Sequence, residues 1–141
     1  MAHRLEIGNR KGVRDVRGES VKERAASILG LRLGAVRTRT VYKIDAKLAP
    51  RELGAVRAAF QDGVMDVSAY GRLRAPAFDW LVEVGFKPGV TDNVGRTARV
   101  ALGDILGRDL GPGEAVYTAT QYFIRAPAAD REAIMGLAGT T

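Results

Sequence analysis

The chain has 141 residues, enough for one domain or two very small ones, and its 46% hydrophobic and 27% charged residues are typical of a globular protein. No apolar run reaches the roughly 20 residues of a membrane span, and the N-terminus lacks the apolar segment of a signal peptide. With no cysteine and a single histidine, His3, the sequence offers no thiolate and almost nothing for zinc or histidine-based catalysis. We therefore expect a cytoplasmic protein without a metal site.

The net charge of +6 is unevenly distributed. Residues 1–74 hold 16 Lys and Arg against 8 Asp and Glu, whereas residues 75–141 hold 6 against 8. A one-sided basic surface can indicate nucleic acid, an anionic ligand or an acidic protein partner, but we favour the simpler interpretation that these charges are solvated.

The first half of the chain predicts strands and helices in the order β-α-β-α-β. Apolar and polar residues alternate in the strands, and the first helix carries an apolar stripe and ends at a glycine. The expected elements are a strand over 3–9, a helix with the stripe Val21, Ala25, Ile28 and Leu29 that stops at Gly30, a strand over 35–46, a helix from Pro50 and a strand over 64–70. Residues 71–78 follow as a linker.

The second half predicts the same elements, except for the last strand. The elements are a strand over 79–86, a helix with the stripe Ala98, Leu102, Ile105 and Leu106 that stops at Gly107, a strand over 115–126 and a helix from Asp130 to about Ala138. The counterpart of the closing strand would lie beyond Thr141. We therefore expect either part of a longer chain or a homo-oligomer that covers an open sheet edge, with the tail after about residue 135 mobile or docked on a neighbour.

The two halves also match residue by residue, which indicates an internal duplication. A shift of 77 positions aligns Glu83 with Glu6, Gly85 with Gly8, Gly89 with Gly12, Val90 with Val13, Asp92 with Asp15, and Gly95 with Gly18. After a short insertion near Pro112 the shift becomes 80, and residues 115–126 align with 35–46. Because about 70 residues build only a thin core, we expect repeats 1–70 and 79–141 to pack about a pseudo-twofold axis around one shared core.

Side-chain alternation divides each long strand into two faces. The phase that both halves share should face the helices; it comprises Val36, Thr38, Thr40, Tyr42 and Ile44, with Val116, Thr118, Thr120, Tyr122 and Ile124. The other phase holds the candidate interface residues. We expect Arg37, Arg39 and Lys43 to border solvent or an acidic partner, and Tyr117 and Phe123 to make a contact between repeats or subunits.

The glycine-rich stretch after the strand of each half raises the question of a phosphate site. In the second half it reads G-F-K-P-G-V-T-D-N-V-G, which fits neither the P-loop nor the dinucleotide-binding pattern. A carboxylate at the helix start would repel a phosphate and instead suits an N-cap. We interpret the shared residues as a structural turn motif, made of Gly12, Val13, Asp15, Gly18, Gly89, Val90, Asp92 and Gly95, and identify no catalytic, cofactor-binding or metal-binding residue.

The run Lys11-Gly12-Val13-Arg14-Asp15-Val16-Arg17-Gly18-Glu19-Ser20-Val21 resembles the signature of the PurS family. PurS is the small accessory subunit of phosphoribosylformylglycinamidine synthase, in de novo purine biosynthesis. The first half is similar to a whole PurS chain, and the second resembles the second part of the duplicated PurS-like region in some long synthase subunits. The resemblance implies an α+β fold of two tandem, ferredoxin-like two-layer repeats with antiparallel sheets and helices on one face, the second repeat lacking its last strand.

The same resemblance implies a non-catalytic role. PurS-like modules bridge a PurQ-type glutaminase and a PurL-type ATP-dependent synthetase and support ammonia transfer between them, so ATP, Mg and glutamine would be used by the complex and not by this chain. Two other functions stay open. One is a tandem ligand-sensing (ACT-like) module that binds an amino acid between the repeats. The other is RNA binding, which is disfavoured because Tyr42 lies in the core-facing phase.

Overall fold

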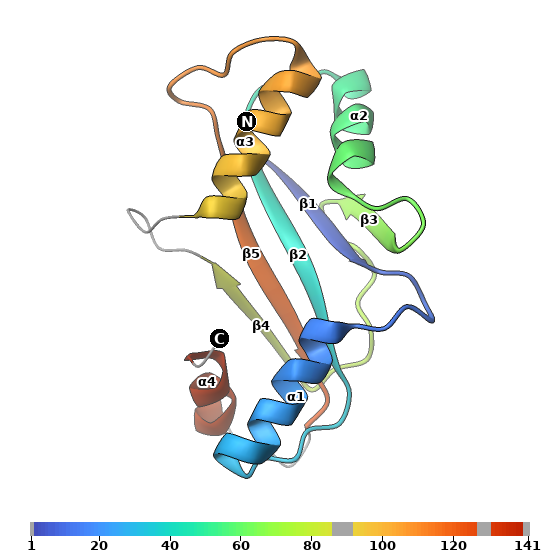
Figure 1. Cartoon of the computed structure of the whole chain (residues 1–141), viewed down its shortest axis with the longest axis vertical. Helices are drawn as coiled ribbons and strands as arrows, with labels where there is room; N and C mark the ends of the chain where they lie inside the picture. Colours follow the sequence, from blue (N-terminus) through green and yellow to red (C-terminus); the bar gives the residue numbers. More distant parts are fainter. Residues whose placement is uncertain (1, 86–91, 127–130, 140–141) are drawn as a thin grey trace.

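The computed structural model describes residues 2–85, 92–126 and 131–139. It is an α+β fold in which an antiparallel five-stranded sheet carries four helices (Figure 1). The elements are β1 (Ala2–Asn9), α1 (Val16–Leu29), β2 (Val36–Asp45), α2 (Pro50–Phe60), β3 (Asp66–Tyr70), β4 (Trp80–Gly85), α3 (Asn93–Leu106), β5 (Ala115–Ile124) and α4 (Arg131–Gly139). Each predicted element is present, and its observed ends lie within a few residues of the expected ones.

The strand order is β3-β1-β2-β5-β4, so β2 and β5 form the centre of one continuous sheet. Their register is centred on Thr40 opposite Thr120, with Val36 opposite Ile124 and Ile44 opposite Val116. Residues that correspond at the shift of 80 therefore form equivalent pairs: Val36 lies opposite Ile124, and their counterparts Val116 and Ile44 lie opposite each other. Beside β2 lies β1, which pairs in turn with β3, whereas β4 lies beside β5 and has no second neighbour in the described part of the chain.

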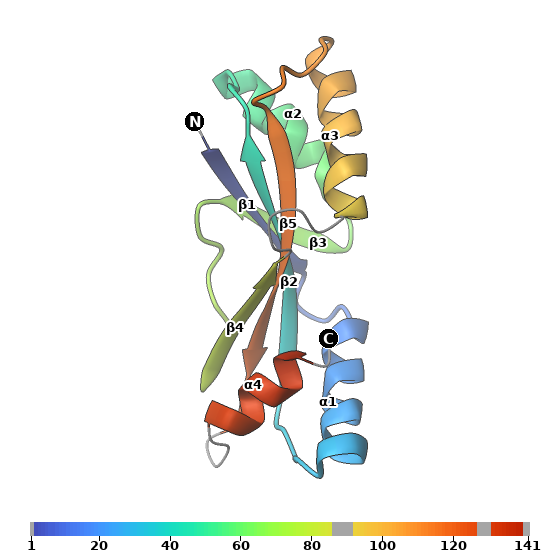
Figure 2. The ribbon, with the colours of Figure 1, turned by 90° about the vertical axis from the view of Figure 1, so that its left-hand side faces the viewer.

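Helices α1, α2 and α3 lie on one face of the sheet and the linker crosses the other, while α4 lies near β4 (Figure 2). We call these the helix face and the helix-free face. The shared phase of β2 and β5 points to the helix face, as predicted: Ile44 packs with Val56 of α2 and Val116 with Leu102 of α3. Tyr42 lies on the same face, with its ring centroid 4.8 Å from that of Phe60. No described helix has the length and apolarity that crossing a bilayer requires.

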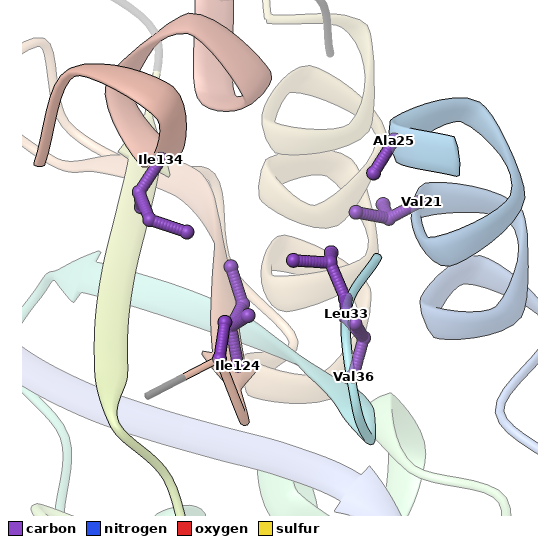
Figure 3. Close-up of a cluster of buried hydrophobic side chains, with 7 residues drawn as sticks. Val21, Ala25, Leu33, Val36, Ile124 and Ile134 are labelled. Atoms are coloured by element: carbon purple, nitrogen blue, oxygen red, sulfur yellow. The ribbon is translucent and has the colours of Figure 1, made fainter. Parts of the chain in front are cut away.

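The sequence predicted one shared core, but the described residues form two hydrophobic clusters on the helix face. The first joins α1 to the far ends of β2 and β5 and to α4 (Figure 3), and consists of Val21, Ala25, Leu33, Val36, Ile124, Ala126 and Ile134. The second joins α2, α3 and the opposite end of the same strands, and consists of Ile44, Ala46, Val56, Ala98, Leu102 and Val116. Each cluster contains residues from before and after the linker, so neither half has a cluster of its own.

The predicted stripe of α1 is only half correct. Val21 and Ala25 are buried, but Ile28 is 66% and Leu29 44% exposed. The last turn of α1 extends past the ends of the strands, so no sheet lies beneath it (Figure 1). The predicted stripe of α3 agrees more closely with the structure, because Ile105 and Leu106 pack against the second cluster.

Candidate functional site: the helix-free face of the sheet

The turn motif ties each helix to a central strand. The Asp15 carboxylate caps α1 by accepting from Gly18 N–H at 2.9 Å, and it also accepts from Thr38 N–H at 2.6 Å and from the Thr38 hydroxyl at 2.9 Å. This carboxylate lies just past the last β1–β2 register pair, Gly8 with Arg39, and so supplies the acceptor that β1 no longer provides. Asp15 is 6% exposed.

Asp92 makes the same set of contacts in the second half. Its carboxylate accepts from Gly95 N–H at 2.7 Å, from Thr118 N–H at 2.9 Å and from the Thr118 hydroxyl at 2.9 Å. The adjoining β4–β5 ladder ends at Gly85 with Ala119, so the cap again follows the last strand pair. Both aspartates are therefore structural, as the sequence predicted for N-caps.

The local backbone explains why glycine occupies several positions of the turn motif. A Cβ on Gly18 would lie 2.1 Å from the Val36 carbonyl oxygen, and one on Gly95 would lie 2.6 Å from that of Val116, so both let a helix approach a strand closely. Gly12 has a φ of 87°, and Val13 N–H donates to Arg10 C=O at 3.0 Å to close the turn. Gly89 and Val90 lie outside the described residues.

The candidate interface residues all lie on the helix-free face. Arg37 is directly opposite Phe123, and Lys43 is directly opposite Tyr117 in the β2–β5 ladder. Arg37, Lys43 and Tyr117 are exposed, Tyr117 by 55%. Phe123, however, is only 3% exposed. Its cover comes from the same chain, because the Phe78 ring of the linker meets it edge-on with centroids 5.5 Å apart.

Arg39 departs from the expectation that this set borders solvent. It is 9% exposed, and its guanidinium donates to the Leu73 carbonyl at 2.8 Å and to the Arg74 carbonyl. The guanidinium carbon also lies 4.7 Å from the centre of the Phe123 ring. Burial lowers the pKa of Arg39, and the nearby Glu6 carboxylate opposes that shift. Arg39 thus fastens the linker to the sheet.

Two glutamates on this face were not predicted as functional. Glu6 is 2% exposed; it accepts from Arg4 Nε at 2.8 Å and from Leu73 N–H at 2.9 Å. Arg4 reaches across the sheet to Glu83, whose carboxylate also lies 3.2 Å from Lys43 Nζ. The hydrogen bond from Arg4 lowers the pKa of Glu83 and raises that of Arg4. The duplication did align Glu83 with Glu6, and that identity was the signal available.

A cavity of about 890 Å³ lies between the linker and the sheet. Its wall includes Arg4, Arg72, Arg74, Phe78, Leu81 and Gln121. A smaller cavity of about 390 Å³, which shares Arg74 with the first, lies towards Lys11 and Arg37. The helix-free face therefore carries a cavity with basic and aromatic walls, covered by a linker that is hydrogen-bonded to the sheet.

The described residues show no arrangement typical of catalysis. They contain no group of three or more His, Cys, Asp or Glu side chains that could hold a metal ion. The Thr97 hydroxyl donates to the Asn93 carbonyl at 3.0 Å, and the His3 ring meets Tyr70 edge-on at 6.4 Å.

No protein-family model matches the chain, and a search of curated proteins finds no similar sequence.

Proposed function

We propose that this chain is a PurS-like assembly module of phosphoribosylformylglycinamidine synthase, a non-catalytic part that bridges a PurQ-type glutaminase and a PurL-type synthetase. The observation that carries the proposal is the repeated turn motif. Asp15 and Asp92 sit in matching runs of sequence, and each binds a helix N-terminus and a threonine of the long central strand in the same way. Such agreement supports repeats 1–70 and 79–141 as a fused pair of one module.

The register of the central strands also supports a fused pair. Contacts across a twofold axis are reciprocal, so a strand that pairs with its own copy places residue i opposite j and j opposite i. The β2–β5 ladder has this pattern, with Val36 opposite Ile124 and Ile44 opposite Val116. In this proposal β4 is the counterpart of β1, since each pairs with the long central strand of its own repeat.

The helix-free face suits docking onto acidic partners. Exposed Arg37 and Lys43 lie on this face of β2. Exposed Tyr117 lies opposite Lys43 on β5, and exposed Leu81 lies on β4, opposite Phe123. Aromatic and arginine side chains with a polar surround are typical of protein interfaces. The sequence has no cysteine to serve as a glutaminase nucleophile and no P-loop, in keeping with chemistry performed by the partners.

The test is reconstitution with the synthetase and glutaminase of the same source. The chain alone should neither hydrolyse glutamine nor consume ATP, and the mixture should co-elute in size-exclusion chromatography and couple glutamine hydrolysis to product formation. Arg37→Glu with Tyr117→Asp should weaken co-elution, whereas Arg96→Glu on α3 should not. Turnover that follows the chain through purification, or a mixture that never associates, would refute the proposal.

A further inference from the structure

The cavity beneath the linker is preformed by contacts between the linker and the sheet. Glu6 accepts the Leu73 N–H, Arg39 donates to the Leu73 and Arg74 carbonyls, and Gly71 N–H donates to the Arg4 carbonyl at 2.7 Å. Because these bonds use linker backbone, they hold residues 71–74 against the sheet whatever the outward side chains do. A volume of about 890 Å³ is in the range of small-molecule sites.

One buried polar atom in the wall lacks a partner. Gln121 is 7% exposed, and its side-chain oxygen has no hydrogen-bond partner in the described part of the chain. A buried acceptor without a donor is costly, and such atoms in folded proteins call for an explanation. The oxygen has almost no accessible surface, so a ligand N–H or O–H donor in the cavity reaches it once the amide group of Gln121, a lining residue, rotates towards the cavity.

The charges of the wall are also unbalanced. Glu6 and Glu83 are matched by Arg4, Arg39 and Lys43 through the contacts described above. The guanidinium groups of Arg72 and Arg74 make no hydrogen bond or ion pair within the described residues, yet both residues line the cavity. A guanidinium binds carboxylate and phosphate oxygens through paired hydrogen bonds. The wall therefore has two arginines available for an anion.

The remaining wall is apolar. Phe123 is buried, whereas Phe78 is 40% and Leu81 47% exposed at the rim. Leu81 lies directly opposite Phe123 in the β4–β5 ladder, so the three side chains form one patch. Such a patch accommodates a flat ring, since ring stacking and edge contacts add to the area buried.

We propose that the cavity binds a small organic anion that combines a flat apolar ring with a hydrogen-bond donor. The anionic group, a carboxylate or a phosphate ester, pairs with Arg72 and Arg74. The ring packs on the exposed parts of Phe78 and Leu81 beside the buried Phe123, and the donor meets the Gln121 side-chain oxygen after the amide group rotates. This assignment is independent of the assembly role, because the walls are complete within the described chain.

The proposal is tested by calorimetry on the whole chain with small probes. 4-Aminobenzoate and 4-aminophenyl phosphate carry all three features and differ in the anion, so the tighter of the two identifies the anion preferred. Benzoate and phenyl phosphate lack the amino donor, aniline lacks the anion, and inorganic phosphate lacks the ring. We expect a complete probe to bind at least about tenfold tighter than each of its incomplete relatives, since one such contact accounts for that factor.

Variants separate this site from general attraction to a basic protein. Arg72→Ala with Arg74→Ala should weaken the complete probes by about tenfold or more, with the linker still held by backbone. Gln121→Leu should abolish the advantage of the amino group without lowering the melting temperature, because it removes an unsatisfied acceptor. Arg96→Ala, an exposed arginine on α3, should bind as the wild type does.

Three results would overturn the proposal. The first is failure of every complete probe to bind up to about 10 mM, a limit far weaker than typical small-ligand affinities. The second is affinity that falls equally in Arg96→Ala and in the arginine pair. The third is a dimer in analytical ultracentrifugation whose interface excludes all probes, which would assign the cavity to a second copy.

Discussion

Replacing Asp15 by Ala tests whether the buried caps hold helix to strand. The substitution removes the acceptor for Gly18 N–H and for Thr38 N–H together. Loss of an N-cap costs about 0.5–2 kcal/mol, and a buried N–H left without a partner costs about 1–3 kcal/mol. Removing the carboxylate also removes the cost of burying its charge, which offsets part of the loss. We expect the free energy of unfolding to fall by about 2–4 kcal/mol.

Asp92→Ala provides an internal replicate. Its carboxylate binds Gly95 N–H and Thr118 N–H with the same geometry, so the loss should agree with that of Asp15→Ala within about 1 kcal/mol. Asp→Asn at either position should lower the free energy of unfolding by less than Asp→Ala does. The amide oxygen still accepts a hydrogen bond, whereas the amide NH₂ is itself a donor and cannot accept from the second N–H group.

The assay is urea denaturation followed by circular dichroism, with the free energy of unfolding obtained by linear extrapolation. Asp109→Ala is the matched control, because it makes the same change of charge at an exposed position and should shift stability by less than about 0.5 kcal/mol. A loss in Asp15→Ala below about 1 kcal/mol, or equal to that of Asp109→Ala, would refute the view that the caps tie helix to strand.

Two further predictions concern packing and pH. Gly18→Ala should destabilise the fold by at least about 1–3 kcal/mol because its Cβ would meet the Val36 carbonyl at 2.1 Å, whereas Gly54→Ala in α2 meets nothing within 4 Å and should stabilise by up to about 1 kcal/mol; thermal melts of both would check this. The Arg108 guanidinium, together with Gly111 N–H, holds the pKa of Glu114 at about 2, below the usual 4.5. Since the folded pKa is depressed, this interaction stabilises the fold above pH 4.5 and is lost as the pH falls towards 2. Glu114→Gln should therefore flatten the decline in urea midpoint between these pH values, and an unchanged slope would contradict the assignment.

Much of the fold could be predicted because its signals are local. A carboxylate at the start of a predicted helix favours an N-cap, and Asp15 accepts a hydrogen bond from Gly18 N–H in the first turn of α1. Gly30 and Gly107 predict helix ends, and both take left-handed φ angles, 62° and 67°. Strict alternation along β2 likewise predicts that Val36 and Ile44 share the helix face.

The candidate site was harder to predict because the burial of its side chains depends on segments that are distant in the sequence. Arg39 and Arg37 lie in the same phase of β2, and nothing in the strand distinguishes them. Arg39 is buried and Arg37 exposed because Leu73 and Arg74 of the linker cross the sheet over Arg39. A linker without secondary structure has no periodicity from which its path could be predicted.

The sequence by itself predicted the elements, the glycine ends of two helices, the phase of the two long strands that faces the helices and the residue identities between the two halves. Each of these depends on neighbours within a few residues or on direct identity. Only the tertiary structure decided that β2 and β5 join both halves into one sheet, that two clusters replace a single core, and that Ile28 lies in solvent. The tertiary structure also decided that Glu6 accepts a hydrogen bond from Leu73 N–H and so holds the linker above a basic cavity. Those features depend on where the chain returns in space, and the free energy of such contacts is set by segments far apart in the sequence.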